Sequence, residues 1–142
     1  MPVISTQDQY SRYSSLVKGG DTPEQMKFFT DAIVINEAGV ATIKLGTVLG
    51  KVTATGKFKV ALQAAVDGSQ VPAGIYTTNA FGAVNDTVTV AATDVKALAL
   101  VRGKIVVARE ALKLDASFGT AAQKQAAYDA LKAIGILVEA SN

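Results

Sequence analysis

The segment LGTVLGKVTATGKFKV, residues 45–60, has the spacing of glycine and lysine that comes closest to a nucleotide-binding loop. Such a loop needs four residues between its glycines, then Lys and Ser or Thr, so that backbone N–H groups surround a phosphate and the hydroxyl binds Mg²⁺. Three residues separate Gly46 from Gly50, and five separate Gly50 from Gly56. In neither case does Ser or Thr follow the lysine. We therefore assign these glycines to strands and turns.

Carboxylates offer a second route to chemistry, because two of them held about 5–10 Å apart in a cleft can carry out acid–base catalysis. The candidates all stand where turns or element ends are expected, positions that favour Asp for capping: Asp67, Asp86, Asp94, Glu110 and Asp115. The sequence has no His, the commonest acid–base group near neutral pH. We expect no enzyme, although an activity that uses Asp or Lys stays open as an alternative.

The sequence offers little that could bind a metal or a cofactor. It contains neither Cys nor His, which excludes zinc sites built from these ligands, and it has no D-x-[DN]-x-[DN]-G loop for calcium. The absence of Cys also excludes disulfides and thiolate chemistry. We expect no catalytic site, no metal and no cofactor.

Three lysines alternate with one aromatic residue in the segment Lys51…Lys57-Phe58-Lys59, as on a surface that binds single-stranded nucleic acid. One aromatic ring makes no stacking platform, and strand alternation directs Phe58 into the core. The net charge of +2 is too small for a nucleic-acid or anionic-membrane footprint. We expect neither partner, and a small-ligand or nucleic-acid-binding β-barrel remains the alternative function.

The length of 142 residues suits one domain, and 49% hydrophobic against 18% charged residues is typical of a globular chain. Large side chains are few, with no Trp, five Phe and four Tyr, which favours thin sheets or contact with other subunits. No apolar stretch of about 18 residues could span a membrane, and the N-terminus lacks the pattern of a secretory signal. We expect a protein that is made and kept soluble.

The first 28 residues differ from the rest, since they are polar and contain few apolar side chains. Gly19-Gly20 forms a joint, and Thr22-Pro23 is typical of a short helix start. We expect residues 1–28 to form an arm, loose over 1–21 in the free protein, and residues 29–142 to form a β-rich domain. The arm's anchors are Val3, Ile4, Tyr10, Tyr13 and Leu16. Helical spacing of its tyrosines would suit an amphipathic turn that docks on a partner, and a disordered tail is the alternative.

From residue 31 the pattern becomes that of β-strands, with short apolar or alternating runs separated by turn signals. The expected strands cover residues 32–35, 40–45, 46–53, 58–62, 71–78, 87–92, 95–108 and 136–138. Residues 79–86 are expected to form a loop. We expect Gly56 to lie in a hairpin turn, Gly46 to begin a strand, and Gly50 to mark a bulge or a close backbone contact.

Other turn and breaker residues divide the second half of the chain. Asp67 and Gly68 belong to a tight turn. Pro72 lacks an N–H group, so it should start a strand or lie at a sheet edge, and Gly103 should break or bulge the strand 95–108. One helix is expected over residues 121–134, and the fold class is mainly β with one C-terminal α-helix (α+β).

This helix has clear end signals. Thr120 and Gln123 fit a capping box, and Gly135 fits the position after the helix end. At 100° per residue, one side of the helix should face the sheet. That side holds Ala126, Ala127, Ala130, Leu131 and Ile134, of which we expect Ala127, Leu131 and Ile134 to be buried.

Several of these segments together resemble a known family. The run from Gly46 to Lys57, GTVLGKVTATGK, followed by DGSQVPAGI at 67–75, is similar to the head decoration proteins of tailed bacteriophages, the family of the lambda decoration protein D. LVRG at 100–103 and ALKAIGI at 130–136 fit the same pattern, so the likeness runs from about Asp31 to Val138. The segment YTTN at 76–79 departs from an acidic AEDV in many members.

The resemblance implies a compact β-barrel or β-tulip-like body with an extended N-terminal arm. It implies a non-enzymatic cement protein that forms homotrimers at three-fold and quasi-three-fold positions on the outer surface of the expanded head. There it would tie neighbouring major capsid proteins of the same phage together against the pressure of packaged DNA. The protein would be made in the host cytoplasm and end on the virion. The arm would order on the capsid, in some members by adding a strand to a capsid sheet.

Overall fold

The computed structural model describes residues 30–37, 39–78, 87–103 and 105–140. The expected arm, the loop 79–86 and Asp86 lie outside these residues. The same holds for the proposed arm anchors, which are Val3, Ile4, Tyr10, Tyr13 and Leu16.

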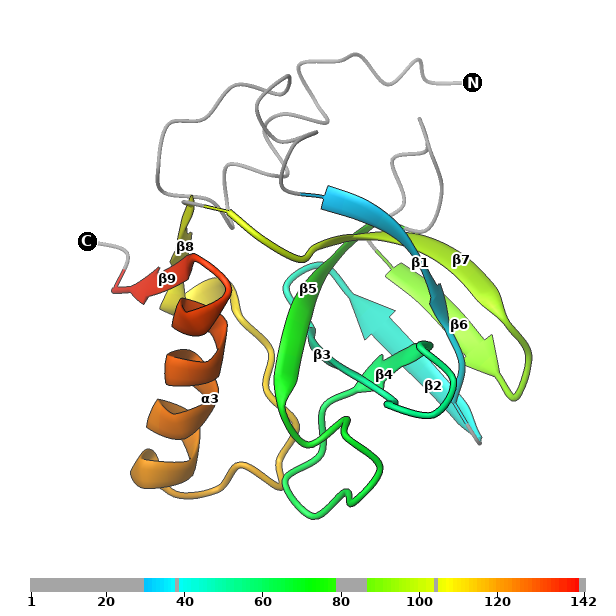
Figure 1. Ribbon diagram of the computed structural model, residues 1–142, viewed down its shortest axis with the longest axis horizontal. Helices are drawn as coiled ribbons and strands as arrows, with labels where there is room; N and C mark the ends of the chain where they lie inside the picture. The colour runs from blue at the N-terminus through cyan, green and yellow to red at the C-terminus, as the bar shows by residue number, and fades with distance from the viewer. Residues whose placement is uncertain (1–29, 38, 79–86, 104, 141–142) are drawn as a thin grey trace.

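Five strands close into a barrel in the order β1-β4-β3-β5-β7 (Figure 1). They are β1 (Thr30–Ile35), β3 (Val48–Lys51), β4 (Phe58–Val60), β5 (Pro72–Thr78) and β7 (Val95–Leu100). Neighbouring strands pair antiparallel except β1 and β4, which are parallel and meet at Ile35 and Phe58. A mainly β fold with a barrel is confirmed.

Two smaller sheets and the helix complete the described chain. Strand β2 (Val40–Lys44) pairs antiparallel with β6 (Thr87–Ala91), and β8 (Ile105–Ala108) pairs parallel with β9 (Ile136–Glu139). A short 3-10 helix, η1 (Arg109–Ala111), follows β8, and the α-helix α3 (Ala121–Ala133) precedes β9. Figure 1 shows α3 beside the barrel, where it packs against β9 and β5.

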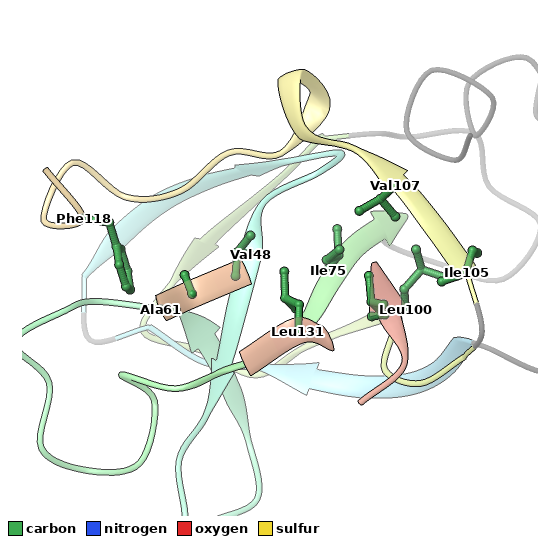
Figure 2. Close-up of a cluster of buried hydrophobic side chains, with 10 residues drawn as sticks. Val48, Ala61, Ile75, Leu100, Ile105, Val107, Phe118 and Leu131 are labelled. Atoms are coloured by element: carbon green, nitrogen blue, oxygen red, sulfur yellow. The ribbon is translucent and has the colours of Figure 1, made fainter. Parts of the chain in front are cut away.

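The strand alternation divides the core into two clusters. Leu49, Tyr76 and Ala99 point into the barrel. Their sequence neighbours Val48, Ile75 and Leu100 point outward, because successive side chains on a strand face opposite sides. The outward cluster is covered by residues of α3, β8, β9 and the segment before α3 (Figure 2). Its members are Val48, Ala61, Ile75, Leu100, Ile105, Val107, Phe118, Ala127, Leu131 and Ile136.

Two expectations about strands are wrong, and a third is confirmed. Gly46 does not begin a strand; it lies in a turn with φ of +92°, and β3 begins at Val48. A Cβ at Gly46 would come within 2.1 Å of the Ala111 carbonyl oxygen, so the close approach of another segment sets this conformation. The strand expected at 58–62 ends at Val60. The expected break at Gly103 is confirmed, because the segment 95–108 forms two strands with Gly103 in the interval between them, and these strands belong to different sheets.

The two ends of α3 have the capping interactions that the sequence predicts. The Thr120 hydroxyl accepts a hydrogen bond from Gln123 N at 3.1 Å, the Gln123 side chain accepts one from Thr120 N, and Gly135 has φ of +93°. The helix ends at Ala133, one residue before the expected end. Ala127 and Leu131 are buried, as expected. Ile134 is only half-buried and Ala126 is exposed, so the side of the helix that faces the barrel is narrower than expected.

Candidate functional site

The glycine- and lysine-rich segment 45–60 forms the β3–β4 hairpin. Its loop closes through Val52 N to Lys57 O and Gly56 N to Val52 O, both at 2.8 Å. Gly56 has φ of +73°, a left-handed conformation that glycine adopts without strain. The segment is a strand, a turn and a strand, and it is not arranged around a phosphate.

Two of the three hairpin lysines form ion pairs. Lys57 Nζ lies 3.0 Å from the Asp94 carboxylate, and Lys59 Nζ lies 3.2 Å from Asp67 Oδ2. Lys51 is exposed, and Phe58 is buried in the barrel. With these charges compensated and the aromatic ring inside, the hairpin offers little of what a nucleic-acid-binding surface needs.

The Asp67 turn is the best-organised polar cluster of the described chain. Asp67 Oδ1 accepts hydrogen bonds from the backbone N and the hydroxyl of Ser69, while the Gln70 side chain accepts one from Gly68 N at 2.9 Å. Ser69 is fully buried. The Ser69 bonds, with a contribution from Lys59, lower the pKa of Asp67 to about 2. The carboxylate thus holds a turn together.

This network makes stability depend on acidity. Because the folded pKa of Asp67 is lowered from 3.8 to about 2, its contribution is present above the unfolded pKa and is lost as pH falls through that interval. We expect Asp67→Asn to be less stable than wild type at pH 7 and to approach it as the pH falls toward 2. Urea unfolding at a series of pH values measures this. A stability difference that stays constant across the series would contradict it.

Gly50 connects the hairpin to the Asp67 turn. A Cβ at this position would lie 2.0 Å from the Ser69 carbonyl oxygen, so only glycine admits the approach. The β3–β5 register shifts between Leu49 and Gly50, and Gly50 is opposite Pro72, the first residue of β5. A bulge and a close backbone contact were expected at Gly50 as alternatives, and both occur there. The hairpin and the DGSQ turn therefore form one packed unit.

Of the other candidate carboxylates, two accept hydrogen bonds from neighbouring residues and one is exposed. Asp94 accepts hydrogen bonds from Lys57 and from Asn36 Nδ2, and these bonds lower its pKa. Asp115 accepts one from Ser117 N at 2.9 Å, and Glu110 is exposed on η1. Within the described part of the chain, no group of three acidic residues could hold a metal ion. The carboxylates were expected at turns and caps, and their Lys and Asn partners were not foreseen.

An open groove of about 540 Å³ lies between β1 and the hairpin loop. Its charged lining residues are Asp31, which pairs with Arg102, and Lys51 and Lys57 from the hairpin. The groove holds a single carboxylate, so it lacks the pair that acid–base catalysis would use.

No helix of the described residues is both long and apolar enough to cross a bilayer.

In the described residues, five strands close into a barrel and α3 packs against it, which defines a β-barrel protein. The family model of the bacteriophage lambda head decoration protein D matches residues 4–136, and the chain belongs to this family. No curated protein gives a significant match. The family is a structural one of phage heads and not an enzyme family, so the chain is a capsid decoration protein of the virion. The match begins at residue 4 and so includes most of the arm, which the motif resemblance did not cover.

Proposed function

We propose that this protein binds the outer surface of the expanded phage head as homotrimers at three-fold and quasi-three-fold sites. There it ties neighbouring major capsid proteins together and stabilises the shell against the pressure of packaged DNA. The observation that carries the proposal is the family match over residues 4–136. The pairing of two hairpin lysines, Lys57 with Asp94 and Lys59 with Asp67, supports a binding role without catalysis.

Within this proposal, the arm of residues 1–28 supplies much of the affinity for the capsid. Its anchors are Val3, Ile4, Tyr10, Tyr13 and Leu16, and burial of even two of them would contribute roughly 3–6 kcal/mol before the cost of ordering. Its backbone could also add a strand to an exposed edge of a capsid sheet. The body offers less, because Lys57 and Lys59 are already paired and exposed ion pairs contribute only ~0–1 kcal/mol each.

Deletion of residues 1–21 is therefore expected to weaken capsid binding at least tenfold, or about 1.4 kcal/mol. The measurement is a titration of the full chain and the truncated chain onto capsids of the same phage assembled without decoration protein. The matched comparison replaces Lys51, Lys57 and Lys59 together by Ala. This triple variant should lose less affinity and mainly change the salt dependence of binding.

The two variants separate the possible sources of affinity. If the truncated chain still decorates capsids while the lysine variant fails, a charged surface of the body and not the arm holds the protein on the shell. If the unmodified chain does not bind expanded capsids at all, the proposed function is wrong.

A further inference from the structure

The boundary between β1 and β4, called the seam here, has the least strand pairing of any contact around the barrel. The two strands share one pair of partners, Ile35 with Phe58, and Asn36 N donates to Phe58 O at 2.9 Å just after it. By contrast, β1 and β7 share six pairs along the whole length of β1, and the other neighbours around the barrel share three each. Because backbone pairs hold a barrel closed, the seam is where separation breaks the fewest of them.

Before that single pair, β1 and the hairpin are already apart. The groove of about 540 Å³ has residues 31–34 on one side and residues 55–57 on the other. Successive residues of a strand direct their backbone groups to opposite edges. Since Asn36 N bonds to β4, the backbone groups of Val34 and Ala32 also face the groove, whereas that of Ile35 faces β7. The seam therefore closes at one end only.

Asp94 bridges that closed end. Its Oδ1 accepts hydrogen bonds from Asn36 Nδ2 at 2.8 Å and from Lys57 Nζ at 3.0 Å. Asn36 follows β1, Lys57 precedes β4, and Asp94 lies in the turn between β6 and β7. The side chains of Lys57 and Asp94 are 39% and 51% exposed, so water competes for these bonds. This Asp94 bridge is a contact that can break and form again without unfolding the protein.

Separation at the seam would leave the rest of the barrel connected. In the order β1-β4-β3-β5-β7, breaking β1 from β4 leaves one curled sheet in which β7, β5 and β3 link the two. Ile35 and Phe58 are buried in the barrel, and their burial favours the closed form. The open form is thus a minor state of the folded protein.

We propose that the seam between β1 and β4 opens and closes in the folded protein, and that the Asp94 bridge holds it shut. Opening would let the β1–β7 pair shift while the hairpin and the Asp67 turn keep their shape. The arm joins β1 at Thr30, so this shift would let the barrel follow the arm. That consequence, unlike the opening itself, rests on the proposed function.

Amide hydrogen exchange of the free, full-length chain, followed by NMR at neutral pH, tests the opening. Each rate is compared with that of the same amide in an unfolded chain. We expect the Asn36 amide, which bonds across the seam, to be protected about tenfold less than the adjacent Ile35 amide, which faces β7. The Tyr76 amide, bonded to Thr47 O at 2.9 Å between β3 and β5, should be protected like Ile35.

Variants test the bridge. Asp94→Ala should speed exchange of the Asn36 amide by about a further fivefold and leave Tyr76 unchanged. Lys57→Ala should have the same effect to a smaller extent, because the bond from Asn36 to Asp94 remains. The matched control is Asp129→Ala, which removes a carboxylate that accepts a hydrogen bond from Gln125 on α3, away from the seam. It should change neither rate.

Each outcome decides the matter. Fast exchange at Asn36 that increases further in Asp94→Ala, with Ile35 and Tyr76 still slow, supports the opening. Equal protection of Asn36 and Ile35 overturns it, because the end of β1 would then separate from both neighbours together or not at all. Equal acceleration of Asn36 and Tyr76 in Asp94→Ala overturns the bridge as the closing contact, since the whole fold would have lost stability. No capsid enters these measurements, so failure to decorate capsids would overturn the proposed function alone.

Discussion

Replacement of Leu131 by Ala is expected to lower the free energy of unfolding by roughly 2–5 kcal/mol. The side chain is fully buried, and Figure 2 shows it among Val48, Ile75 and Leu100 of the barrel's outer face. Ala is the best helix former, so the loss would come from packing and the cavity left behind and not from helix propensity. This contact fastens α3 to the barrel.

Chemical denaturation at neutral pH measures this effect. The matched control is Leu137→Ala on β9, which removes the same atoms from a side chain that is 40% exposed. It should cost less than about 1 kcal/mol, because surface substitutions have small effects. A loss below about 0.5 kcal/mol for Leu131→Ala would mean that the helix does not pack on the barrel as described.

Replacement of Gly50 by Ala is expected to cost about 3 kcal/mol, at the upper end of the usual effect of overpacking. The new Cβ would lie 2.0 Å from Ser69 O and 2.6 Å from Ser69 C. These are backbone atoms, so no side chain can rotate to relieve the clash, and either β3 or the Asp67 turn must move. The substitution should therefore disturb the 61–71 loop as well as the barrel.

The matched control is Gly39→Ala, where an added Cβ has no neighbour within 4 Å. It should change stability by less than about 0.5 kcal/mol. Thermal or urea unfolding of both variants gives the comparison. Similar stabilities for Gly50→Ala and Gly39→Ala would show that Gly50 and Ser69 do not approach each other closely.

Features set by local interactions could be predicted from the sequence. The helix start depends on Thr120 and Gln123, three residues apart, and its end on Gly135, so a short segment holds all the information. The same is true of Gly56 in the hairpin turn and of Pro72 at the start of β5. Family membership was also predictable, because the hairpin and DGSQ motifs are continuous in sequence.

The polar cluster was partly predictable. Asp67 and Gly68 indicate a tight turn, and a hydroxyl two residues after Asp67 is a local signal for the bonds that Ser69 makes. The Lys59 partner lies eight residues away on β4, and Asp94 meets Lys57 across 37 residues. Such pairs depend on which strands become neighbours, so no local pattern reveals them.

By itself, the sequence determined the β-rich class, the helix near the C-terminus and its caps, the hairpin and the absence of thiol and imidazole chemistry. Only the tertiary structure decided that β2 pairs with β6 and that residues 95–108 divide between two sheets. It also decided that Gly46 lies in a turn against Ala111. The physical reason is range: caps and turns are satisfied within a few residues, whereas strand pairing and backbone contacts join segments that the chain brings together only when the whole core forms.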